Sequence, residues 1–218
     1  MTHPRSELLL IRHGHAHCND TGTIAGPACT GLTDTGTAQA AATAAWLAST
    51  GPVRAVHAST TRRAADTAKV IAARLGLAVI AEPGLRVPDP GAAEGVPWPQ
   101  ARGIWPADPH NATRPAAPGG EAWCAYLDRA TVALGRILEL HPGGRIVVVG
   151  HTETLTAMLH HLLGVAGLGR LKLAFDHAAC SLWQATSEWP GIAPPWQRWT
   201  LVRHNQPCTP APAAITAT

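Results

Sequence analysis

Two short apolar runs, each followed by a histidine, set the strongest limits on how this chain folds. Residues 8–11 are Leu-Leu-Leu-Ile and lead into Arg-His-Gly, and residues 146–149 are Ile-Val-Val-Val and lead into Gly-His. Runs of this length and composition are typical of buried strands, and ligands collect where the strands of an open α/β sheet end. We therefore predict that His13 and His151 share one site at the end of a sheet.

Strand and helix patterns alternate along most of the chain. The expected strands are 7–11, 54–58, 77–81 and 145–149, and the expected helices are about 35–48, 61–75, 121–140 and 153–163. Thr33 is suited to cap the first of these helices and Gly76 to end the second. Such repetition predicts a three-layer α/β/α fold with a mostly parallel central sheet. Two later strand patterns, at 181–185 and 197–203, predict a C-terminal edge hairpin.

Residues 87–118 interrupt this alternation. They hold eight prolines together with Trp98 and Trp105, a composition that excludes long helices but is too aromatic for a free linker. We interpret the segment as a cap insertion within a single domain of residues 1–205. Residues 206–218 carry prolines among Ala and Thr without periodicity and are expected to form a disordered tail.

Composition and charge exclude several classes of protein. A chain of 218 residues with 46% apolar residues can build one full core. The net charge of +3 is scattered over single residues and pairs, which does not favour nucleic acid as a partner. The five cysteines include no C-x-x-C pair and are expected to be reduced, which predicts a cytoplasmic protein. No apolar run has the length of a membrane span, so we expect no membrane partner.

The sequence around His13 is similar to that of one enzyme family. Residues 12–19, Arg-His-Gly-His-Ala-His-Cys-Asn, followed by 32–40, resemble the opening of the histidine phosphatase superfamily, the phosphoglycerate mutase-like proteins. Residues 59–68 resemble its second block, in which a serine precedes by four residues an arginine, here Arg63. The resemblance covers most of the chain, and its further segments are 119–121 with Arg129, and 149–151.

This resemblance implies phosphoryl chemistry. Arg12 and Arg63 would hold the phosphoryl oxygens through bidentate, charged bonds. His13, a neutral imidazole with one ring nitrogen held by a backbone carbonyl, would attack phosphorus, and water would resolve the phosphohistidine. His151 would be a second donor, which we expect to be cationic. Asn19 would bond a phosphoryl oxygen or brace its own loop. Further substrate contacts are expected from Thr152, His177 and Trp98.

The sequence departs from the family at Val87. There the family carries a glutamate that donates a proton to the leaving alkoxide, and valine cannot do so. Without a donor, loss of an alkoxide of high pKa would slow by about 10² to 10⁴. Asp89 and Glu153 are equal candidates to replace this acid, and Glu94 ranks behind them.

The leading hypothesis is a phosphatase that hydrolyses a small-molecule phosphate monoester. One alternative is phosphoryl transfer of the phosphoglycerate mutase type. Another, motivated by Val87, is a noncatalytic or recruited pocket that holds a phosphate or carboxylate ligand. We expect no cofactor and no metal, because His13, His15 and His17 alternate on one loop without a carboxylate. The oligomeric state is not predictable from these patterns.

Overall fold

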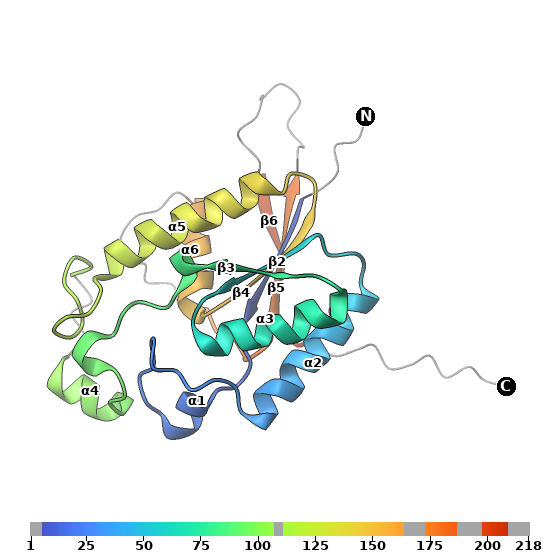
Figure 1. The fold of residues 1–218 in the computed structure, drawn as a ribbon. Helices are drawn as coiled ribbons and strands as arrows, with labels where there is room; N and C mark the ends of the chain where they lie inside the picture. Colours follow the sequence, from blue (N-terminus) through green and yellow to red (C-terminus); the bar gives the residue numbers. More distant parts are fainter. Residues whose placement is uncertain (1–5, 107–110, 164–172, 187–197, 209–218) are drawn as a thin grey trace.

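A six-stranded sheet forms the centre of the computed structural model, which describes residues 6–106, 111–163, 173–186 and 198–208 (Figure 1). Its strands are β1 (Glu7–Arg12), β2 (Ala55–Ser59), β3 (Val79–Glu82), β4 (Arg145–Gly150), β5 (Cys180–Thr186) and β6 (Arg198–Gln206). The order across the sheet is β3-β2-β4-β1-β5-β6. The first four strands in this order are parallel to one another, β5 is antiparallel to β1, and β6 is antiparallel to β5. The mostly parallel sheet with an antiparallel C-terminal edge is therefore confirmed.

Helices cover both faces of this sheet. They are α1 (His17–Thr21), α2 (Asp34–Ser49), α3 (Arg62–Leu75), α4 (Trp98–Ile104), α5 (Trp123–Leu140) and α6 (Thr152–Leu163), with short 3₁₀ turns at Pro83–Leu85 and Gly91–Ala93. The pair α2 and α3 packs on one face, and the pair α5 and α6 packs on the other (Figure 1). The predicted three-layer α/β/α architecture is thus confirmed.

The two central strands are buried on both sides, which explains their continuous apolar runs. The core under α5 and α6 contains the even-numbered apolar residues of both strands, which are Leu8, Leu10, Ile146 and Val148. The core under α2 and α3 contains the odd-numbered ones, which are Leu9, Ile11, Val147 and Val149. Each such side chain contributes about 1.5–3 kcal/mol by leaving water. This burial fixes the strand ends, and with them the residues that follow each run.

The expected helices and strands are all present, with small shifts at their ends. Thr33 caps α2 as predicted, because its Oγ1 accepts a hydrogen bond from the Gly36 amide at 3.1 Å. Gly76 ends α3 in the left-handed conformation, with φ of 69°. The Leu77 amide bonds back to the Ala72 carbonyl at 3.0 Å, so β3 begins only at Val79. The short helices α1 and α4 were not predicted, since five and seven residues give too little periodicity to detect.

The cap insertion is attached to the loop that follows α1. The Trp98 amide donates to the Gly22 carbonyl at 3.0 Å, and the Ile24 amide donates to the Val96 carbonyl at 2.9 Å. These bonds hold α4 close to α1 at one end of the sheet (Figure 1). The first half of the cap is therefore fastened by its backbone.

The predicted domain limits, 1–205 and 206–218, stay predictions. Gln206 is the last residue of β6 and Cys208 is buried. The rest of the predicted tail, 209–218, lies outside the described residues. Within the described part of the chain, no helix is both long enough and apolar enough to cross a membrane.

Two glycines let the loop after β1 lie directly against the start of α2. A Cβ on Gly14 would stand 2.5 Å from the Gly36 carbonyl oxygen, and a Cβ on Gly36 would stand 1.9 Å from the His15 carbonyl oxygen. Neither gap accepts a methyl group, because the atoms in the way belong to the backbone. This close packing holds the segment that carries His13.

Replacing Gly36 by alanine should therefore destabilise the protein. We expect Gly36→Ala to lower the free energy of unfolding by about 1–3 kcal/mol, the usual effect of overpacking a closed site. Gly103→Ala is the matched control, because Gly103 lies in α4 with open space around its Cβ position, and alanine favours a helix by up to about 1 kcal/mol. Urea unfolding measures both. Equal stability of Gly36→Ala and the wild type would contradict the close packing.

Candidate active site

His13 follows the last residue of β1 and is held in one orientation. Its amide donates to the Gly150 carbonyl at 2.9 Å, which ties the ends of β1 and β4 together. Its Nδ1 lies 2.8 Å from the Gly14 carbonyl oxygen, and a carbonyl only accepts, so Nδ1 carries the proton. Arg63 donates from Nε to the other ring nitrogen, Nε2, at 3.1 Å. His13 thus presents the lone pair of Nε2 toward a guanidinium.

The surroundings of His13 keep its imidazole neutral. Burial lowers its pKa well below the ordinary value, and the cations Arg63 and Arg12 lower it further. The hydrogen bond to the Gly14 carbonyl acts in the opposite direction but does not offset them. A neutral imidazole with a free lone pair is the nucleophilic form of histidine.

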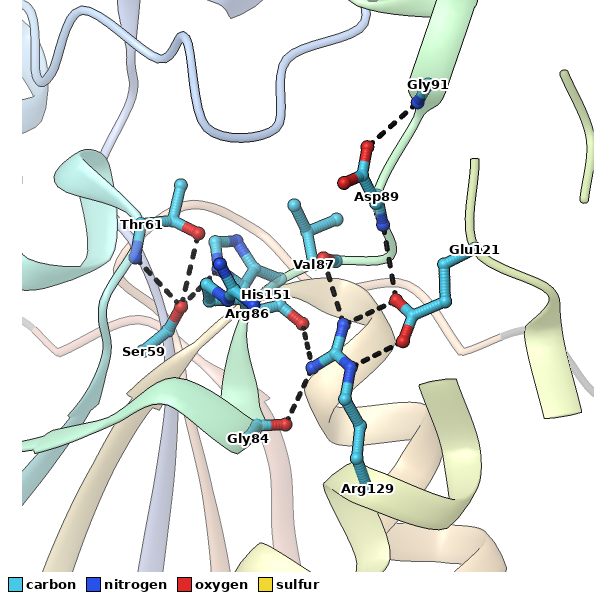
Figure 2. Close-up of polar contacts among 10 residues, drawn as sticks. All are labelled: Ser59, Thr61, Gly84, Arg86, Val87, Asp89, Gly91, Glu121, Arg129 and His151. Atoms are coloured by element: carbon cyan, nitrogen blue, oxygen red, sulfur yellow. Dashed lines mark hydrogen bonds and ion pairs between the residues drawn. The ribbon is translucent and has the colours of Figure 1, made fainter. Parts of the chain in front are cut away.

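His151 lies beside His13, at the end of β4. The two ring centroids are 5.2 Å apart, which confirms that the strand-end histidines come together. Ser59 Oγ is 2.9 Å from His151 Nε2, accepts the Thr61 amide at 3.2 Å and donates to Thr61 Oγ1 at 3.3 Å (Figure 2). These contacts hold the His151 ring with its Nδ1 left without a hydrogen-bond partner among the described residues.

The protein's own charges oppose the cationic form of His151. Burial lowers its pKa well below the ordinary value, and Arg63, His13 and Arg12 lower it further. A side chain enclosed by the protein and surrounded by positive charge is more stable when it is neutral. The imidazolium expected from the sequence therefore stays a prediction for the state with a bound anion.

Several buried polar atoms around His13 have no hydrogen-bond partner among the described residues. They are Arg12 Nε, Arg63 Nη1, His151 Nδ1 and His177 Nε2. The His177 ring lies 5.6 Å from the His13 ring, between centroids. Each unpaired buried group costs about 1–3 kcal/mol, and such groups are rare in folded proteins. Their concentration at one point indicates a site built for an anion with several oxygens.

Two hydroxyl side chains hold this arrangement, and the sequence analysis gave neither a role. Thr67 Oγ1 accepts the Gly14 amide at 3.0 Å and donates to the Arg63 carbonyl at 2.8 Å. Ser59 orients His151 as described above. Both residues belong to the 59–68 block. Each is a polar residue at a buried position of a helix or strand, and this pattern in the sequence could have indicated their roles. Arg62, the neighbour of Arg63, is exposed and pairs with Asp66 at 3.5 Å.

A cavity of about 660 Å³ opens in front of His13. Among the predicted site residues its lining includes Arg12, His13, Asn19, Arg63, Asp89, Trp98, Thr152 and Glu153. Val87 also lines it, as do Cys18, Arg114 and Trp123, which the sequence analysis did not assign to the site. His151 and His177 contribute their rings next to His13 instead.

Two of the predicted contacts also have structural roles. Asn19 Oδ1 accepts the Ala16 amide at 2.9 Å and so braces the loop after β1. Arg12 donates from Nη1 to the Phe175 carbonyl, which fixes the direction of its guanidinium. The Ala178 amide donates to the Arg12 carbonyl at 3.0 Å, and this contact sets His177 beside the site.

Arg129 clamps the loop that contains Val87. Its guanidinium forms two bonds of 2.6 Å with the Glu121 carboxylate and donates to the carbonyls of Gly84 at 2.8 Å, Arg86 at 2.9 Å and Val87 at 3.2 Å (Figure 2). Glu121 Oε2 also accepts the Asp89 amide at 3.2 Å. The backbone from 84 to 89 is thus fixed at the edge of the cavity.

The three candidate acids have different environments. Asp89 is exposed, and its Oδ1 accepts the Gly91 amide at 2.9 Å. Glu153 lies in the first turn of α6, near enough to Arg12 to stabilise its positive charge. Glu94 Oε1 instead binds the amides of Gly26 and Ala28, at 2.8 Å and 3.2 Å, and Glu94 does not line the cavity.

No group of three or more histidine, cysteine, aspartate or glutamate side chains in the described ranges is arranged to hold a metal ion. His15 Nδ1 lies 3.2 Å from Thr33 Oγ1, which connects the loop after β1 to the cap of α2.

The histidines of the site, whether buried or partly buried, should make stability depend on pH. His177 is the clearest case, since burial, Arg12 and His15 lower its pKa to about 4, against about 6.5 in an unfolded chain. Its contribution is fully present above pH 6.5 and is lost as the pH falls toward 4. We expect urea unfolding to show this loss in the wild type and less of it in His177→Gln. His17→Gln, at an exposed position, is the control. An equal loss in both variants would contradict the assignment.

Comparison with known proteins identifies the family. The family model for the histidine phosphatase superfamily (branch 1) matches residues 8–192. The chain is 36% identical over 159 residues to phosphoglycerate mutase-like protein 4 of Arabidopsis thaliana, covering 70% of this chain and 69% of that protein. It is 30% identical over 174 residues to the metal-independent phosphoserine phosphatase of the same plant, covering 76% and 72%.

Longer relatives and solved structures agree with this result. The chain spans about half the length of mycobacterial relatives that it matches at 32% identity, for example a bifunctional protein of Mycobacterium tuberculosis. Its fold is shared with the mycobacterial glucosyl-3-phosphoglycerate phosphatase, with a TM-score of 0.76 at 24% identity over 93% of this chain and 99% of that chain. The chain therefore belongs to the histidine phosphatase superfamily, branch 1.

Proposed function

We propose that this protein is a phosphatase that hydrolyses a small-molecule phosphate monoester through a phosphohistidine on His13. The observation that carries the proposal is the neutral His13, whose Nε2 accepts a hydrogen bond from Arg63 and lies among buried nitrogen atoms of Arg12, Arg63 and His151 that have no partner within the described residues. A phosphoryl group supplies several anionic oxygens that such donors can bind. Similarity to a metal-independent phosphoserine phosphatase supports this class of reaction.

In the first step, His13 Nε2 attacks phosphorus and the bond between phosphorus and the ester oxygen breaks. Arg12, Arg63 and the Nδ1 of His151 bind the phosphoryl oxygens as charge develops on them. The charge of the phosphoryl group opposes the effect of the two arginines on His151, whose pKa is otherwise low. The leaving alkoxide takes up a proton from an acid.

In the second step, water attacks phosphorus while the carboxylate of the acid takes one of its protons, and the bond between phosphorus and Nε2 breaks. The Gly14 carbonyl keeps its hydrogen bond from Nδ1 throughout, so Nε2 recovers its lone pair in the original position. Inorganic phosphate leaves. Because the ring does not turn between the steps, the site is ready for another substrate.

We assign the role of proton donor to Asp89, with Glu153 as the alternative. Asp89 lines the cavity on a loop that Arg129 and Glu121 hold in place, and its Oδ2 is not occupied by the Gly91 amide. Glu153 lines the same cavity, but it acts as a countercharge to Arg12. A carboxylate in that position supports the phosphate-binding arginine more directly than it serves the leaving group.

The cavity favours a substrate with an apolar or aromatic part. Trp98 and Trp123 lie in its wall, together with several proline and alanine side chains. Arg114 adds a positive charge away from the loop of His13. A phosphate ester whose other end combines an apolar surface with a hydrogen-bond acceptor fits this lining.

A second candidate function is the binding of a phosphate or carboxylate ligand without turnover. Val87 favours it, because this side chain lines the cavity where the family carries its acid. Transfer of the phosphoryl group to a second position, as in a mutase, is the other alternative, and it requires a phosphohistidine that resists water. Release of inorganic phosphate separates hydrolysis from both.

Phosphate release from monoesters with leaving groups of graded pKa tests the mechanism. We expect His13→Ala to abolish release for every ester. Asp89→Asn should slow esters of high leaving-group pKa by about 10² to 10⁴ and phenolic esters much less. If Glu153→Gln has this selective effect instead, the roles of the two carboxylates are exchanged. Binding of inorganic phosphate without release from any ester would favour the noncatalytic pocket.

Restoring a carboxylate at position 87 gives a complementary test. Val87→Glu places an acid on the clamped loop and should accelerate esters of high leaving-group pKa relative to the wild type. Val87→Leu is the matched control, since it preserves the apolar character without adding a proton donor. We would measure the dependence of kcat/KM on leaving-group pKa for all three proteins. An unchanged slope in Val87→Glu would show that this loop does not face the leaving group.

A further inference from the structure

A tight turn just before β5 holds a histidine against the nucleophile. The Ala179 amide donates to the Asp176 carbonyl at 3.2 Å and closes this turn. His177 lies within it, and its ring centroid is 5.6 Å from that of His13. The His15 ring is 5.0 Å away, in an edge-to-face arrangement. His177 therefore packs against two rings from the segment that follows β1.

This turn contains a strained backbone conformation. Ala178 has a φ of 58°, in the left-handed region that favours glycine. Within the described ranges, Asn205 is the only other residue besides glycine with a positive φ, and it supports the same turn. The Asp176 amide donates to Asn205 Oδ1 at 2.7 Å, and Asn205 Nδ2 donates to Asp176 Oδ2 at 3.0 Å. Both left-handed residues thus help to set the position of His177.

Three further hydrogen bonds fix Ala178 in this conformation. Its amide donates to the carbonyls of Arg12 at 3.0 Å and His13 at 3.3 Å, and its carbonyl accepts from Thr43 Oγ1 at 2.9 Å. Thr43 is a buried residue of α2. A strained residue persists only where its surroundings hold it, and such residues are concentrated at functional sites. The strain at Ala178 lies at the point that sets His177 beside His13.

His177 has a buried ring nitrogen without a partner. Its Nε2 makes no hydrogen bond to any of the described residues. The same is true of one nitrogen on each of Arg12, Arg63 and His151. The mechanism above gives those three residues a phosphoryl oxygen to bind but leaves His177 without one. A buried polar nitrogen that the protein does not satisfy is well placed to bind a ligand.

We propose that His177 is a further ligand of the phosphoryl group, donating from Nε2 to one of its oxygens, and that His177 takes up a proton from solvent when the anion binds. This role rests on the phosphatase function proposed above, and it adds one residue and one proton to that site. In the imidazolium both ring nitrogens carry a proton, so Nε2 is a donor whichever nitrogen is protonated in the free protein. The proton returns to solvent when phosphate leaves.

The surroundings of His177 keep its ring neutral in the free protein. Burial is the largest cause that lowers its pKa, to about 4, and Arg12 and His15 lower it further. The titratable and charged side chains that face it come from β1, the segment after β1 and its own turn, and they are Arg12, His13, His15 and Asp176. The side chains that support the turn from α2 and β6, Thr43 and Asn205, are uncharged.

A bound anion changes this balance. The negative charge of a phosphoryl group offsets the charge of Arg12 and raises the pKa of His177 in the complex. Between the two pKa values, binding takes up as much as one proton, and the affinity for the anion falls as the pH rises across this range. His177 suits this role better than His13 or His151, because it is partly exposed whereas those two rings are buried.

Calorimetric titration with inorganic phosphate at about pH 6, in the range where histidine titrates, tests this role. Titrations in buffers of different ionisation enthalpy give the number of protons taken up on binding. We expect the wild type to take up more than His177→Gln, by a fraction that approaches one proton, because glutamine can donate to an oxygen but cannot titrate. The ionisation of phosphate itself contributes to both proteins and cancels in the difference.

Two further variants complete the comparison. His177→Phe keeps a ring at this position but removes the donor. It should raise the Kd for phosphate roughly tenfold or more, the effect of losing one hydrogen bond to a charged group. His17→Gln makes the glutamine substitution at an exposed histidine and should behave like the wild type in both measurements.

The other outcomes separate the role of His177 from the function of the site. Equal proton uptake by the wild type and His177→Gln would overturn the coupling to a proton. An unchanged Kd in His177→Phe would overturn the contact with the phosphoryl group. Both results leave the proposed function intact where the wild type binds phosphate and releases it from esters. Absence of phosphate binding to the wild type would contradict the proposed function and, with it, the role of His177.

Discussion

The hydrogen bond from His13 Nδ1 to the Gly14 carbonyl is the constraint on which the rest of the site depends. It leaves the Nε2 lone pair facing the buried Arg63 and the partly buried Arg12, and burial together with these two cations keeps the ring neutral. Burying cationic groups without full partners is costly, and the sheet ends and Thr67, which bonds the backbone of Gly14 and Arg63, hold them against that cost. The site therefore holds hydrogen-bond donors that lack a protein partner and that an anionic ligand can satisfy.

The sequence predicted the parts of the site that depend on local patterns. Apolar runs of fixed length located both strand ends, and parallel pairing of β1 with β4 then brought His13 and His151 together. The resemblance to a family pointed to Arg63, whose Nε donates to His13, whereas the adjacent Arg62 is exposed. These features follow from strand burial and helix periodicity, and a few neighbouring residues are enough to specify either pattern.

Features that depend on distant neighbours were not predictable in the same way. The charge of His151 is set by residues from β1 and α3, so a strand-end pattern cannot reveal it. The contact of Ala16 with Leu32 arises from one isolated bridge between irregular segments. The cap lacks any repeating pattern, and only its bonds to the loop after α1 show which of its residues face the cavity.

The clamp formed by Arg129 binds the carbonyls of Gly84, Arg86 and Val87, which every amino acid possesses. These three bonds are therefore independent of the side chains that the loop presents. A substitution at 87 can exchange an apolar group for an acid and keep the clamp. Within one unchanged scaffold, the proton donor can migrate along the loop during evolution, and related enzymes can acquire new leaving-group preferences one residue at a time.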